Sequence, residues 1–143
     1  MGYIPEDAKW YLADMIFELR IEGRKRSLVH INRILIRADS PDEAFEESNR
    51  LGKARSYSYM NPDGAKVRCK FRGLRELLVI HEDLEHGAEI AYTELQSVTE
   101  AKIKKLTSKK RDLGVFAPRV VTTSADYMPR EIAEHLKKLG FRI

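Results

Sequence analysis

The sequence predicts an α+β fold, in which helices cover one face of a mostly antiparallel β-sheet. Segments of alternating apolar residues follow one another with only short turns between them, which favours antiparallel strands. Clear helix signals occur at residues 40–52 and 128–141. The expected element order is β-β-α-β-β-β-β-α-α.

The first two strands are expected within residues 10–23 and 27–38. In WYLADMIFELRIEG, every second residue from Tyr11 to Ile21 is apolar, whereas the other register is mixed. This pattern is typical of a strand with one buried face. SLVHINRILIRA is rich in Val and Ile, so we expect it to form an antiparallel hairpin with the first strand.

The first helix is predicted at DSPDEAFEES. Ser40 can cap the helix, Pro41 suits its first position, and Asp42 favours the positive end of the helix dipole. Glu43 stands three residues after Ser40, which completes a capping box. The helix is expected to end near Gly52. Its predicted inner stripe consists of Ala44, Phe45, Leu51 and Ala54.

Further strands are expected at residues 56–60, 65–73, 74–83 and 88–96, with a turn at NPDG between the first two. A helix is predicted over residues 99–114, and 115–128 is expected to wrap the surface. Pro129 near the start of the last helix and Gly140 after it mark its ends. We therefore expect a single domain over 1–118 and a docked C-terminal tail, 119–143, with one amphipathic helix.

Composition excludes several classes of protein. The 143 residues suit one domain, and a hydrophobic fraction of 43% is enough for a core. A net charge of +4 does not by itself indicate nucleic-acid binding. No apolar run approaches the roughly 20 residues that span a bilayer, and the N-terminus lacks a signal-peptide pattern. We expect a soluble, cytoplasmic protein without membrane contact, and the lone Cys69 excludes an internal disulfide.

The segment HEDLEHG, residues 81–87, combines residue types that bind metals. Zinc proteases place two His residues four apart on one helix face, whereas His81 and His86 are five apart. A zinc site needs three or four converging ligands. The favoured interpretation is a solvated acidic turn closed by Gly87. The alternative is a metal site, with His81, His86, Asp83 and Glu82 as candidate ligands and His30 as a further one.

Two basic stretches suggest a site for nucleic acid or another phosphate ligand. Arg68, Lys70 and Arg72 alternate with apolar residues, so they would share one face of the sheet. Such cations can contact phosphates. The run 102–111 adds candidates, namely Lys104, Lys105, Lys109 and Lys110. The favoured interpretation is nevertheless an ordinary solvated face, paired with the acidic clusters at 42–47 and 82–89.

No motif predicts catalysis or a cofactor. The sequence contains no GxGxxG, Walker A, GxSxG or CxxC pattern. Cys69 shares the alternation of Val67 and Phe71, which favours an inert, buried thiol over a nucleophile. No cofactor is therefore expected.

Several separated phrases resemble one known family: WYLADMIFELRIEG, VHINRILIRADSPDEAFEES, FRGLRELLVIHEDLEHGAEIAY and DLGVFAP. They are similar, in this order, to DUF4288, a family of small bacterial proteins of unknown function. The resemblance extends over about residues 10–118. It implies a compact α+β domain and brings no activity, cofactor or site residue.

The sequence as a whole favours a non-catalytic module that binds a protein partner or associates with itself. The interface candidates lie on the C-terminal helix and just beyond it, at Ile132, Leu136, Leu139 and Phe141. That helix packing on its own domain is the competing interpretation. Phosphate-ligand binding is the second hypothesis, and a metal-dependent hydrolase around His81 and His86 is the third.

Overall fold

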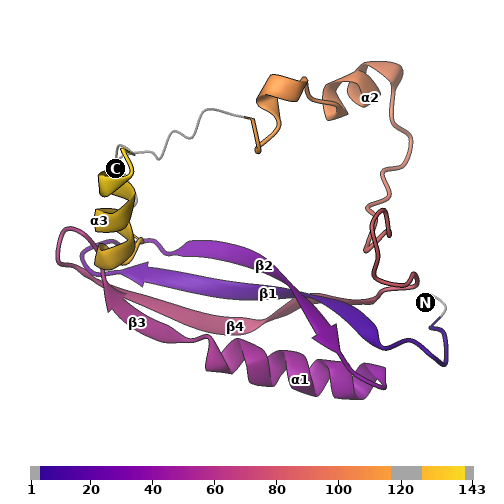
Figure 1. Cartoon of the computed structure of the whole chain (residues 1–143), viewed down its shortest axis with the longest axis horizontal. Coiled ribbons are helices and arrows are strands. Elements are labelled where there is room, and N and C mark those ends of the chain that lie inside the picture. Colours follow the sequence, from indigo (N-terminus) through magenta and orange to yellow (C-terminus); the bar gives the residue numbers. More distant parts are fainter. Residues whose placement is uncertain (1–3, 117–126, 141–143) are drawn as a thin grey trace.

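The structure is a computed structural model that describes residues 4–116 and 127–140. A four-stranded antiparallel sheet, in the order β2-β1-β4-β3, has helix α1 along one face (Figure 1). The α+β class is thus confirmed. The elements are β1 (Trp10–Ile21), β2 (Leu28–Arg37), α1 (Pro41–Ala54), β3 (Tyr57–Met60), β4 (Lys66–Val79), α2 (Glu100–Leu106), the 3₁₀ turn η1 (Lys110–Asp112) and α3 (Arg130–Lys138).

The central strand β1 pairs antiparallel with β2 on one side and with β4 on the other, as the predicted hairpin requires. Its register places Phe17 opposite both His30 and Phe71. The predicted alternation is confirmed, because every second residue from Tyr11 to Ile21 is buried in the core. β1 thereby supplies the centre of the core, with Phe17 against Phe71 at a ring separation of 5.6 Å.

The prediction of two strands over residues 65–73 and 74–83 is wrong, because β4 runs unbroken from Lys66 to Val79. Gly73, which was expected to end a strand, lies inside it with a φ of 133°. The register against β1 shifts between Asp14 and Met15 and again between Ile16 and Phe17. These bulges flank the position of Gly73 and absorb its conformation without ending the strand.

Helix α1 begins as predicted, with the Ser40 hydroxyl accepting a hydrogen bond from the Glu43 backbone N–H at 3.1 Å. The Glu43 carboxylate, however, accepts from the Asp39 N–H at 3.3 Å, so it does not close the expected capping box on Ser40. The helix continues past Gly52 to Ala54.

The predicted inner stripe of α1 is partly wrong. Phe45 and Ala54 are exposed, and the buried residues are Ala44, Ser48 and Gly52. The helix can approach the sheet closely because these residues are small. A Cβ atom on Gly52 would lie within 2.6 Å of the Phe71 ring.

Two further predictions after β4 are wrong. No strand forms over residues 88–96, because these alternating side chains remain exposed and have no sheet face to bury them. The helix predicted over 99–114 is limited to α2 and η1. It breaks at Thr107, whose backbone is extended and whose hydroxyl donates to the Lys104 carbonyl at 3.0 Å.

The last helix, α3, follows Pro129 as predicted and packs near the far end of the sheet (Figure 1). Ala133 is its buried residue, and the Tyr127 ring meets the His30 ring edge-on at 5.4 Å. His30 lies on the same face of the sheet as Phe17, so α1 and α3 cover one face. The predicted domain boundary near Pro118 and most of segment 115–128 lie outside the described residues.

Candidate functional site

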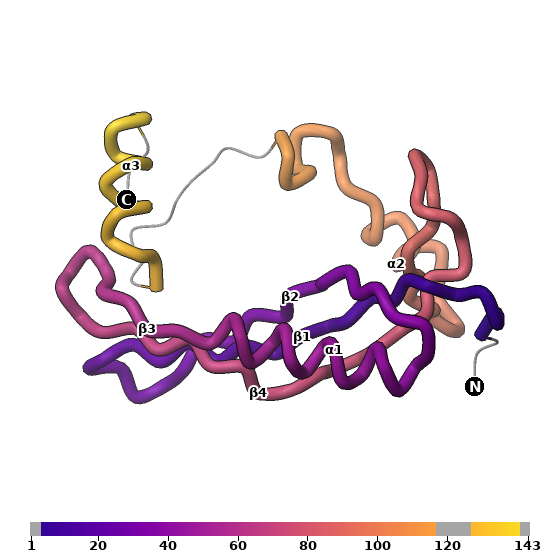
Figure 2. Tube along the Cα trace, turned by 60° about the horizontal axis from the view of Figure 1, so that its bottom comes forward, coloured from indigo at the N-terminus to yellow at the C-terminus, as the bar shows by residue number. Residues whose placement is uncertain are grey.

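The chain leaves the sheet after Ile80, which is buried and donates its backbone N–H to the Trp10 carbonyl at 2.9 Å. Residues 81–116, which we call the arm, extend from this end of the sheet and carry α2 away from it (Figures 1 and 2). No residue of α2 or η1 is buried. The arm therefore contributes little to the core of its own chain.

Large apolar side chains of the arm face solvent. Tyr92 is 76% exposed, Leu106 61% and Val115 83%. The Lys110 ammonium lies 5.2 Å from the centre of the Phe116 ring, which still leaves that ring about half exposed. The complete set is Leu84, Ile90, Tyr92, Leu95, Ile103, Leu106, Leu113, Val115 and Phe116. Exposed apolar side chains are thus concentrated in the arm.

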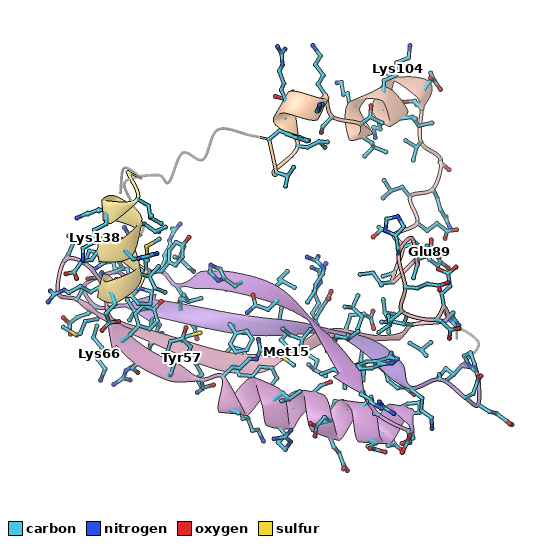
Figure 3. All side chains as sticks on the ribbon, viewed as in Figure 1. Met15, Tyr57, Lys66, Glu89, Lys104 and Lys138 are labelled. Carbon is cyan, nitrogen blue, oxygen red and sulfur yellow. The ribbon has the colours of Figure 1, made fainter. Side chains whose placement is uncertain are left out.

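Charge divides the arm into two halves. The acidic half, residues 81–100, contains six carboxylates and neither Lys nor Arg. The basic half, residues 101–116, contains six Lys or Arg residues and the single carboxylate of Asp112. Glu89 marks the acidic half near the end of the sheet, and Lys104 marks the basic half away from the sheet (Figure 3). The arm is thus a strongly dipolar segment.

The base of the arm folds against the end of β4. There the Glu89 backbone N–H donates to the Glu82 carboxylate, and Gly87 takes a φ of 86° in the turn between them. A pocket of about 440 Å³ lies at this base. It is lined largely by apolar residues, among them Leu77, Val79, Ile90 and Tyr92.

The metal candidates occupy the same turn. His81, Glu82 and Asp83 line a small pocket beside Trp10, but His86 is not among the residues that line it. Over residues 4–116 and 127–140, no group of three or more His, Cys, Asp or Glu side chains is placed to hold a metal ion. The structure therefore does not bring the four candidate ligands together, and His30 lies on β2, in contact with Tyr127.

The basic candidates of β4 lie on the sheet face opposite α1, but they do not form an uninterrupted cationic stripe. Glu18 of β1 is paired with Lys70 in the register, and its carboxylate accepts a hydrogen bond from Arg72 at 2.7 Å. The hydrogen bonds from Ser27 and then Arg72 are the main causes that lower the pKa of Glu18. Glu18 thus places a negative charge on β1 beside the β4 cations, opposite Lys70 and in contact with Arg72.

The remaining basic candidates, Lys104, Lys105, Lys109 and Lys110, all lie in the arm, with the latter two beside Phe116 in a shallow pocket. They are exposed and are not joined to the β4 cations in one groove. The nucleic-acid hypothesis therefore rests on two separate basic regions.

The interface candidates of α3 differ in their environments. Ile132 lines a pocket of about 390 Å³ between α3 and the sheet, Leu136 is half-buried and Leu139 is 62% exposed. Phe141 lies outside the described residues. Tyr59 lines the same pocket, and burial raises its pKa to about 12. Its hydroxyl donates to the Tyr127 carbonyl, so the residues just before α3 also make a polar contact with the sheet.

Cys69 also lines this pocket, where burial raises the pKa of its thiol. A raised pKa disfavours the thiolate, which is the reactive form. The structural environment thus favours the interpretation of Cys69 as an inert thiol.

The fold is that of a small α+β protein in which an antiparallel sheet is followed by an exposed arm. The profile of the family DUF4288, a domain of unknown function, matches residues 10–92, so the chain belongs to this family. The match covers the sheet, α1 and the base of the arm, and it ends before α2, short of the residue 118 suggested by the sequence resemblance. No curated protein and no solved structure matches the chain.

In the part of the chain that the structure describes, no helix is long and apolar enough to cross a membrane. The sequence reasoning missed two features. The apolar residues of the acidic half were assigned to a strand, although the division of charge at residue 100 is visible in the sequence. The cations near the β1–β2 turn, Arg24, Lys25 and Arg26, are not among the candidates that the sequence predicts.

Proposed function

We propose that this protein is a non-catalytic module that associates with a second copy of itself through the arm. The observation that carries the proposal is that the arm exposes many apolar side chains and has one acidic half and one basic half. Two arms related by a two-fold axis run antiparallel, so the acidic half of each faces the basic half of the other. Such an interface is self-complementary, as isologous contacts require.

The free energy gained by burying the apolar side chains of two arms is large enough to support their association. Moving a large apolar side chain from about half exposed to buried contributes about 1 kcal/mol. The exposed apolar residues of two arms together would therefore offset an association cost of about 4–15 kcal/mol. Complementary charge fixes the orientation of the two arms, and like charges placed opposite each other would oppose their pairing.

The test uses two charge-reversal variants of the full chain. In the first, Glu85→Lys, Glu89→Lys and Glu94→Lys neutralise the acidic half. In the second, Lys104→Glu, Lys105→Glu and Lys109→Glu remove the excess positive charge from the basic half. Native mass spectrometry and light scattering, each over a range of concentrations, report the subunit number of each protein alone and of their mixture.

We expect the wild type to form a dimer, each variant alone to be monomeric, and an equimolar mixture to form a heterodimer. The two variants should attract each other because the intact basic half of the first faces the intact acidic half of the second. The matched control, Glu43→Lys with Glu46→Lys and Glu47→Lys on α1, should dimerise like the wild type. A monomeric wild type, or dimers in both variants, would refute the proposal.

A further inference from the structure

A second surface, separate from the arm, concentrates positive charge at the opposite end of the sheet. Lys66 marks this end in Figure 3, whereas Glu89 on the arm lies at the other. A pocket of about 360 Å³ is formed there by the end of β1, the β1–β2 turn and the start of β4. Its lining includes five cations and one carboxylate: Arg20, Arg24, Lys25, Lys66, Arg68 and Glu22.

The strand register brings two of these cations side by side. Arg20 of β1 and Arg68 of β4 are direct cross-strand partners on the face opposite α1. Like charges directly opposite each other across a sheet are destabilising. Lys66 lies across from Glu22, whose backbone N–H donates to the Lys66 carbonyl at 2.9 Å.

Glu18 does not neutralise the Arg pair. Arg20 Nε lies 3.5 Å from a Glu18 carboxylate oxygen, but Glu18 already accepts hydrogen bonds from Ser27 at 2.6 Å and Arg72 at 2.7 Å. The Arg20 side chain is 74% exposed, so water screens this contact. The pocket lining thus holds more cations than carboxylates, with the Arg20 and Arg68 guanidinium groups on neighbouring strands.

We propose that this pocket binds the diphosphate group of a small molecule. Arg guanidinium groups present paired N–H donors that match the oxygens of a phosphate, and two adjacent Arg residues suit two adjacent phosphates. The pocket volume lies within the range of small-ligand sites. A compact anion fits better than a long nucleic-acid strand, because the Glu18 carboxylate lies next to the Arg20–Arg68 pair on β1, opposite Lys70, and accepts a hydrogen bond from Arg72.

The test is isothermal titration calorimetry of the full chain at low salt, with inorganic pyrophosphate and adenosine diphosphate titrated separately. The variants are Arg20→Gln and Arg68→Gln. The matched control is Arg75→Gln, an exposed cation on the same strand as Arg68 but not among the residues that line the pocket. A 12-nucleotide single-stranded DNA is a third probe.

We expect pyrophosphate to bind at one site per chain, with an affinity at least about tenfold lower in either pocket variant and unchanged in the control. If adenosine diphosphate binds with the same affinity as pyrophosphate, the pocket recognises the diphosphate group alone. If adenosine diphosphate binds more tightly, the ligand is an esterified diphosphate. The proposal is overturned if pyrophosphate gives no binding, or if Arg75→Gln weakens binding as much as Arg68→Gln. Binding of the DNA without binding of pyrophosphate would also overturn it.

Discussion

At the scale of single residues, Gly52 illustrates how one side chain sets the distance between a helix and the sheet. The Phe71 ring occupies the space that any Cβ at position 52 would need. Phe71 in turn packs against Phe17 in the centre of the core. The absence of a side chain at position 52 is therefore a packing requirement, although in sequence the glycine resembles a helix end.

We predict that Gly52→Ala lowers the free energy of unfolding by about 1–3 kcal/mol, because overpacking outweighs the gain of about 1 kcal/mol in helix propensity. Urea unfolding followed by circular dichroism measures it. Gly114→Ala, where a Cβ meets no atom within 4 Å, is the neutral control. In the double variant with Phe71→Leu the two costs should not add, since the ring no longer clashes. Additive costs would show that Phe71 is not the cause.

At the scale of elements, two helices with similar caps differ in what they pack against. The Ser40 hydroxyl caps α1 and the Thr99 hydroxyl caps α2. Helix α1 contributes Ala44 to the core, whereas α2 has no buried residue. The caps satisfy the same backbone groups, so any difference in their effect on unfolding comes from tertiary packing.

We therefore predict that Ser40→Ala lowers the free energy of unfolding by about 1 kcal/mol. Thr99→Ala should leave the urea midpoint unchanged and reduce only the helical signal of the arm. Urea titration of both variants, read by tryptophan fluorescence at Trp10 and by circular dichroism, separates the two effects. An equal loss of stability in both variants would mean that α2 belongs to the cooperative core.

At the scale of the whole molecule, the chain combines a packed sheet with an arm that extends from it. Exposed lysines and arginines occur in both the sheet and the arm, but the backbone hydrogen bonding around them differs. Those of β4 are held in the ladder with β1 and β3, whereas residues 107–109 between α2 and η1 lie outside any helix or strand. Proteases cut where the backbone can leave its hydrogen bonds at little cost.

At a protein concentration below that at which two arms pair, limited trypsin digestion should therefore cut first within residues 102–111 and leave a resistant fragment that contains the sheet and α1. Mass spectrometry of the fragments at early times identifies the sites. The β1–β2 turn serves as an internal reference, since Arg24, Lys25 and Arg26 are equally exposed but are confined between two paired strands. Early cleavage at that turn would show that the arm is no more open than the hairpin.

Much of the fold could be predicted because its signals are local. The alternation in β1, the Ser40 cap and the Pro129 start of α3 each depend on neighbours within a few residues. The predictions that were wrong concern segments whose structure depends on contacts with residues distant in sequence. Gly73 continues a strand because β1 accommodates its bulges, and residues 88–96 stay extended because no sheet face covers them.

The candidate sites divide in the same way. The sequence by itself determined the α+β class, the family and the chemistry of the candidate residues, since composition and period-two or helical spacing are carried by the chain. Only the tertiary structure decided which of these residues meet. Strand pairing places Arg20 opposite Arg68 and inserts Glu18 among the β4 cations. The tertiary structure also does not bring the four metal candidates together, and it leaves the apolar side chains of the arm exposed. Register and burial depend on contacts between segments that are distant in sequence, so the local pattern does not determine them.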